Sequence, residues 1–125
     1  MDSANPEELL AKTYVQEADL YFDGVTDWKP IGKDYSLPFT GSYDGKDYKI
    51  YNLNIVGVAE EGKVVQYTGF FGAINNATLS NITIASGEVK GYRYTAALAA
   101  RAQGSGEVVN CQNYATVIGE ETVTG

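Results

Sequence analysis

A short phrase built around an asparagine recurs every 29 residues and constrains this chain more than any other feature. Its three copies are residues 50–55 (IYNLNI), 79–84 (LSNITI) and 108–113 (VVNCQN), with the asparagines at Asn52, Asn81 and Asn110. Flanking segments repeat at a spacing of 28: GSYD at 41–44, GFFG at 69–72 and ALAA at 97–100, then GEVKG at 87–91 and ATVIG at 115–119. A fixed period of about 30 residues indicates a coil that repeats along an axis.

Each asparagine is expected to form a corner. Leu53 and Ile55 alternate as in a strand, but Ile50 lies three residues before Leu53 and would face the other side of a straight strand. One left-handed residue at Asn52 restores the alternation, and asparagine tolerates that conformation better than most non-glycine residues. The repeat therefore predicts a structural ladder in which the amides of Asn52, Asn81 and Asn110 stack along the axis.

Stacked coils of three short strands would form a parallel β-helix, an all-β fold, of about three to four coils with neighbouring strands about 4.8 Å apart. The predicted interior columns are Tyr43/Phe71/Ala99 or the alternate register Ser42/Phe70/Leu98, then Ile50/Leu79/Val108, and Leu53/Ile82/Cys111. The single cysteine is thus expected to be a small core residue. An antiparallel sandwich also contains many short strands, but it does not predict phrases matched at 28–29 residues.

Several of these motifs resemble the repeat of bacterial surface proteins that carry the GLUG motif. Residues 38–53 (PFTGSYDGKDYKIYNL) are similar to the family's F-x-G-x-[FY]-D-G strand followed by an I-x-N-L corner. Residues 69–72 stand at its G-L-F-G signature, and residues 97–100 are the next copy with alanine in place of both glycines. Upstream, ADL at 18–20 and WKPIG at 28–32 resemble the lead-in to the first coil. The resemblance covers residues 14–119.

The resemblance implies a right-handed β-helix in a bacterial extracellular or cell-surface protein. The family contains adhesin-like proteins and non-catalytic segments of secreted peptidases that cleave immunoglobulin A. The chain is therefore expected to be a fragment of a longer protein, without that protein's signal peptide. The alanines at 97–100 and Arg101 after them depart from the family pattern and weaken any inference about that surface.

The sequence predicts one domain over residues 1–125, with a cap helix at 1–13, lead-in strands at 14–40 and repeats of 28–29 residues at 41–125. The helix start is indicated by Asn5 as N-cap, Pro6 in the first turn and the acids Glu7 and Glu8 near the positive end of the dipole. No equivalent cap is evident at the other end. The last coil is therefore expected either to continue into a longer β-helix or to pair end to end with another molecule.

Composition excludes several functions. A net charge of −7 argues against nucleic acid or an anionic membrane surface as partner, and the apolar runs are too short to insert into a bilayer. The absence of histidine removes the commonest general base and most zinc sites. Asp19, Asp23 and Asp27 offer oxygen ligands, but their spacing matches no calcium loop. We therefore predict no catalytic residues, no metal site and no cofactor.

Surface binding remains. Ten tyrosines are many for 125 residues, and tyrosine combines a flat apolar ring with a polar tip. Tyr92, Arg93 and Tyr94 cluster with Lys90 and form the predicted patch for a glycan or a host surface protein, although tyrosine is also simply a good strand residue. The predicted function is a non-catalytic β-helix module that acts in adhesion or as a rigid spacer. The alternative is an accessory segment of a secreted enzyme, either polysaccharide-active or an immunoglobulin A peptidase.

Overall fold

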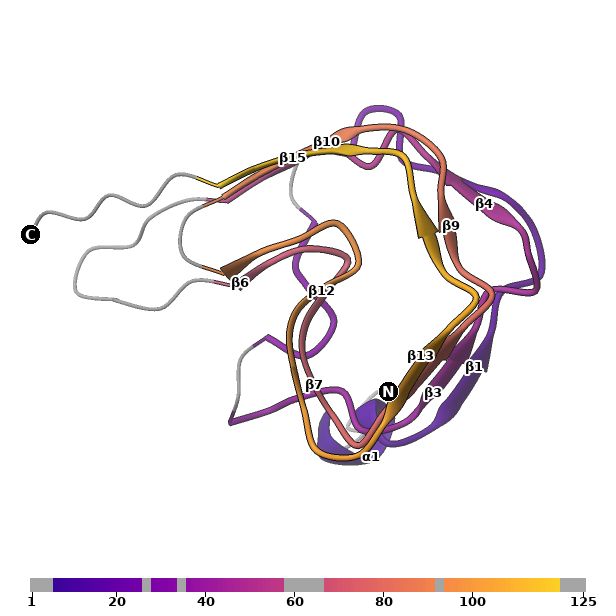
Figure 1. Cartoon of the computed structure of the whole chain (residues 1–125), viewed down its shortest axis with the longest axis vertical. Helices are drawn as coiled ribbons and strands as arrows, with labels where there is room; N and C mark the ends of the chain where they lie inside the picture. Colours follow the sequence, from indigo (N-terminus) through magenta and orange to yellow (C-terminus); the bar gives the residue numbers. More distant parts are fainter. Residues whose placement is uncertain (1–5, 26–27, 34–35, 58–66, 92–93, 120–125) are drawn as a thin grey trace, which may run out of the picture.

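The computed structural model describes residues 6–25, 28–33, 36–57, 67–91 and 94–119. It is a right-handed parallel β-helix of about three turns, preceded by one short helix, α1 (Pro6–Leu10), and seen along its axis in Figure 1. Every pairing between its strands is parallel. No helix within the described residues is long and apolar enough to cross a membrane.

The strands are short and follow the coils in order. The first coil contains β1 (Thr13–Val15) and β2 (Leu20–Tyr21). The second contains β3 (Ser42–Asp44), β4 (Lys49–Tyr51), β5 (Ile55–Val56), β6 (Tyr67–Thr68) and β7 (Phe71–Asn75). The third contains β8 (Thr78–Ser80), β9 (Thr83–Ile84), β10 (Glu88–Gly91), β11 (Tyr94–Thr95) and β12 (Ala99–Gln103), and the last β13 (Glu107–Val109), β14 (Gln112–Asn113) and β15 (Thr116–Gly119). They stack into the sheets β1-β3-β8-β13, β2-β4-β9-β14, β5-β10-β15, β6-β11 and β7-β12.

The register confirms part of the predicted repeat and corrects the rest. Phe71 pairs with Ala99 and Val89 with Val117, as the 28-residue spacing predicts. The 41–44 copy was wrongly matched, because Ser42 pairs with Thr78 rather than with Phe70. The physical reason is a longer second coil, since residues 57–66 separate β5 from β6 whereas only residues 92–93 separate β10 from β11.

The predicted ladder of three asparagines is wrong as a single stack, although its corners are confirmed. Asn52, Asn81 and Asn110 have φ angles of 57°, 54° and 55°, all left-handed. However, Ile50 of β4 pairs with Ile84 of β9, so Asn52 lies at a different corner from the other two. The extra residues in the second coil place its hydrogen-bond partner Ser86 34 residues on, rather than 29.

Two corner ladders result. In the Asn81 ladder, Asn110 Nδ2 donates to Asn81 Oδ1 at 2.7 Å, and Asn81 Nδ2 donates to Asp44 Oδ1 at 3.0 Å. In the Asn52 ladder, Ser86 Oγ donates to Asn52 Oδ1 at 3.2 Å, and Asn52 Nδ2 donates to Asp23 Oδ1. Both ladders therefore begin at an aspartate in an earlier coil.

A third corner at Asn76 was not predicted. Its φ is 57°, and its Oδ1 accepts the backbone N–H of Ser105 at 2.7 Å. The signal was present in the sequence, because Asn76 directly precedes the buried Ala77, as Asn52 precedes Leu53 and Asn81 precedes Ile82.

The interior is filled by aliphatic and aromatic side chains from all but the last coil. Those in the core cluster are Phe39, Ile50, Leu53, Ile55, Phe70, Phe71, Ile74, Ala77, Leu79, Ile82, Ile84, Val89 and Ala97. Both candidate registers at the GFFG segment contribute, since Phe70 and Phe71 are buried together. Cys111 packs half-buried against this cluster. Val108 was expected in the interior but is 52% exposed, because it lies in the last coil.

The two ends of the β-helix differ. At the first end, Leu10 of α1 packs against the core cluster, and its carbonyl accepts the N–H of Thr40 at 2.8 Å. The lead-in segment, residues 14–40, passes beneath β7. It forms two isolated parallel β-bridges with that strand, from Ile31 to Phe71 and from Phe39 to Ile74. At the other end, β13, β14 and β15 each pair with another described strand on one side only.

Candidate binding face

The outer face of the sheet β2-β4-β9-β14 gathers exposed aromatic side chains. Ile50 and Ile84 are fully buried, so the residues on either side of them in the chain point outward. Parallel hydrogen bonding continues past the strands, since Ala85 N–H donates to Ile50 O at 2.7 Å and Tyr114 N–H to Ile84 O at 2.8 Å. One outward column is therefore Tyr21, Tyr51, Ala85 and Tyr114. We call it the tyrosine column.

The tyrosine column contains a ring at every coil except one. Tyr21 and Tyr51 stack with centroids 5.0 Å apart and planes 8° from parallel. Tyr21 and Tyr114 are 63% and 68% exposed, so the rings at both ends of the column are open to solvent. Ala85 occupies the coil between Tyr51 and Tyr114. Because neighbouring strands lie about 4.8 Å apart, its methyl leaves one ring position vacant between two tyrosines.

A second outward column supplies polar groups beside the tyrosines. It consists of Lys49, Thr83 and Gln112, which pair across β4, β9 and β14. Gln112 Oε1 accepts a hydrogen bond from the Tyr114 hydroxyl at 3.3 Å, which links the two columns. The Asp19 carboxylate accepts the backbone N–H of Lys49 at 2.8 Å. A neutral ligand with several hydroxyls could use the hydroxyl, amide and ammonium groups of this column.

The predicted patch is only partly described. Tyr92 and Arg93 lie outside the described residues. Lys90 alternates with the buried Val89 and Gly91, so its side chain points away from the interior. A Cβ on Gly91 would lie 2.6 Å from Thr95 Oγ1, so Thr95 faces β10, and its neighbour Tyr94 faces away from β10. The side chain of Lys90 on β10 and that of Tyr94 on β11 thus point away from each other.

Tyr94 belongs to a different aromatic group. It stacks on Tyr67 with centroids 4.9 Å apart and planes 25° from parallel. The Arg101 guanidinium lies 5.9 Å from the centre of the Tyr94 ring and donates to the Tyr67 hydroxyl at 3.3 Å. Tyr67 is buried, so this group is largely an internal contact in which Arg101 holds two rings together.

Acidic and thiol groups form no cluster suited to a metal within the described part of the chain. The carboxylates of Asp19 and Asp23 each accept a hydrogen bond from the next coil, and Asp27 lies outside the described residues. Burial raises the pKa of the Cys111 thiol, which favours its neutral form.

No family model, curated protein or solved structure matches this chain. The resemblance to the GLUG repeat therefore stays a prediction.

Proposed function

We propose that this chain is a non-catalytic β-helix module of a bacterial cell-surface or secreted protein, and that it binds glycans through the tyrosine column. The single observation that carries the proposal is the exposed stack of Tyr21 on Tyr51, with a vacant ring position at Ala85 before Tyr114. The rigid backbone around it supports the role, because the ladders and parallel sheets hold the rings without further ordering on binding.

A pyranose ring suits this face for a physical reason. Its C–H groups form a flat apolar surface that packs on an aromatic ring, while its hydroxyls point outward in the ring plane. A sugar over Ala85 would place an apolar face against a tyrosine. Its hydroxyls could then reach Thr83 and Gln112 in the neighbouring column, which are neutral donors and acceptors.

The proposal is tested by an array of microbial and host glycans, with mucin and matrix proteins included. We expect a saturable interaction that Tyr51→Ala and Tyr114→Ala each weaken about tenfold, because each removes one ring contact. Tyr48→Ala, an exposed tyrosine outside the column, is the matched control. The proposal is abandoned if both column variants bind like the wild type.

The same array separates this face from the patch first predicted at Tyr92 and Tyr94. If the ligand is lost with Tyr94→Ala but kept with Tyr51→Ala, binding belongs to that patch. If no glycan or protein binds, a spacer role is favoured instead, for which the two corner ladders and the continuous sheets supply the stiffness.

A further inference from the structure

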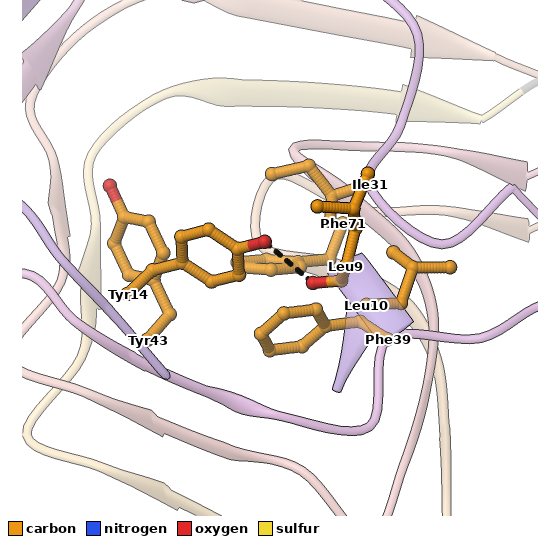
Figure 2. Close-up of a pocket in the computed structure, with 7 residues that line it drawn as sticks. All are labelled: Leu9, Leu10, Tyr14, Ile31, Phe39, Tyr43 and Phe71. Atoms are coloured by element: carbon orange, nitrogen blue, oxygen red, sulfur yellow. Dashed lines mark hydrogen bonds between the residues drawn. The ribbon is translucent and has the colours of Figure 1, made fainter. Parts of the chain in front are cut away.

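A small apolar pocket lies beneath α1 at the first end of the β-helix. Tyr114, the last ring of the tyrosine column, lies in the last coil at the other end. The volume of the pocket is about 150 Å³. Figure 2 shows the side chains that converge on it from α1, β1, β3, β7 and the lead-in segment. They are Leu9, Leu10, Tyr14, Ile31, Phe39, Tyr43 and Phe71.

The polar atoms at the pocket are already satisfied. The Tyr14 hydroxyl donates to the Leu9 carbonyl at 2.5 Å, the dashed line in Figure 2. The Tyr43 hydroxyl donates to Oε1 of Gln16 at 3.0 Å, and the Gln16 amide donates to Ala18 O at 2.9 Å. Burial also raises the pKa of Tyr43, which keeps its hydroxyl neutral. An occupant therefore finds no charge and no unpaired hydrogen-bonding side chain among these residues.

The size and lining of the pocket favour a ring. An enclosed apolar cavity of about 150 Å³ accepts a molecule such as benzene, and this pocket has the same volume and an apolar lining, with a rim open to solvent. Here Phe39 contacts Phe71 at a centroid distance of 5.1 Å and a 46° tilt, and Tyr43 meets Phe71 edge-on at 5.7 Å and 82°. Rings already set at such angles offer both faces and edges to a further ring.

Access is through the cap. Leu9 and Tyr14 are 43% and 37% exposed, so the rim of the pocket reaches solvent. The helix that covers it has only five residues, and a helix this short has little stability of its own. It is attached to the coil by the packing of Leu10 against the core, by the Tyr14 hydroxyl on the Leu9 carbonyl and by the Thr40 N–H on the Leu10 carbonyl at 2.8 Å. We therefore expect a ligand to enter at the exposed rim beside Leu9 and Tyr14.

We propose that the pocket beneath α1 binds one small, neutral, apolar ring of about the size of benzene. The site is separate from the glycan-binding face, since the two share no residue.

The test titrates benzene against the full chain and follows both methyl and aromatic NMR signals and the thermal unfolding temperature. We expect saturable shifts confined to α1 and the residues around Phe39 and Phe71, together with a rise in unfolding temperature, because a ligand of the native state stabilises it by mass action. The polar ring myo-inositol should give neither effect. Tyr51→Ala should leave benzene binding unchanged, which separates this proposal from the one above.

Two filling variants make the result decisive. Leu10→Phe, or Ile31→Phe if the first does not fold, should occupy the cavity and remove the saturable shifts. Val56→Phe, at an exposed position on β5 outside the pocket, is the matched control and should bind benzene like the wild type. The proposal is overturned if benzene at its solubility limit gives no saturable shift, or if the shift survives both filling variants.

Discussion

Asp44 shows at the scale of one residue how a corner ladder is anchored. Its Oδ1 accepts the side-chain amide of Asn81 at 3.0 Å and the backbone N–H of Lys46 at 2.8 Å. A carboxylate can only accept, so it ends a chain of amide donors without leaving an unpaired N–H. The Asn81 hydrogen bond is also the main reason that the pKa of Asp44 is lowered below its ordinary value of 3.8.

We therefore expect an NMR titration to give Asp44 a pKa below 3.8, and Asn81→Ala to raise it. Because the folded state holds the lowered pKa, the stabilisation is present above the ordinary pKa and is lost as pH falls through the folded value. An unchanged Asp44 titration in Asn81→Ala would mean that the amide does not set its charge.

The backbone at the corner can be separated from the amide. Asn81→Gly keeps the left-handed conformation and loses only the hydrogen bonds, whereas Asn81→Ala also strains the backbone at a φ of 54°. We expect alanine to lower the free energy of unfolding in urea by about 2–3 kcal/mol, and glycine by about 1 kcal/mol less. Equal losses would show that the backbone conformation contributes little.

At the scale of elements, the lead-in segment explains why the GFFG segment has Gly72 where the ALAA segment has Ala100. A Cβ on Gly72 would lie 2.3 Å from the carbonyl oxygen of Gly32, because the lead-in segment crosses directly under β7. The equivalent position on β12 is Ala100, which is one strand further from that segment. Ala100, which stands where the GFFG copy has Gly72, is thus tolerated because the lead-in segment is not adjacent to β12.

Gly72→Ala should accordingly lower the free energy of unfolding by about 1–3 kcal/mol, since the obstructing atom is backbone and cannot swing away. Ala100→Gly is the reciprocal control and should cost less than 1 kcal/mol. Urea denaturation of both variants checks the difference. A neutral Gly72→Ala would show that the lead-in segment can move off β7.

The fold and its corners could be predicted from the sequence, but the register between the coils could not. The period and the left-handed corners predicted a parallel β-helix, because both are local signals carried by residues such as Asn81 and Asn110. Register between coils depends on how many residues each coil contains, and the longer stretch between β5 and β6 shifted Asn52 onto Ser86. The tyrosine column was not predicted for the same reason. Only the observed register places Tyr51 and Tyr114 on either side of Ala85.

At the scale of the whole molecule, the two ends offer different surfaces to a partner. The first end is covered by α1, whereas the last coil exposes Val108, Val109 and Val117 at 52%, 49% and 40%. The outer edges of β13, β14 and β15 have no partner strand among the described residues, and such edges beside exposed apolar side chains favour association. We propose that two copies associate through their last coils, because α1 obstructs a head-to-tail arrangement.

We expect sedimentation velocity to show a concentration-dependent dimer that does not grow into filaments. Val108→Lys should shift the equilibrium to monomer by placing like charges across a two-fold axis, whereas Leu9→Lys at the covered end should leave it unchanged. A monomer at every concentration, or open-ended polymers, would contradict this arrangement.

The aspartates that begin both corner ladders also give the β-helix a direction. In each ladder the donor amide belongs to a later coil and the acceptor to an earlier one, from Asn110 to Asn81 to Asp44 and from Asn52 to Asp23. During synthesis the acceptor oxygens of an earlier corner therefore emerge first. The amide N–H donors of the next corner emerge later and can bond to them. We therefore expect the coils to form in order from the first to the last, each finished coil serving as the template for the next during synthesis.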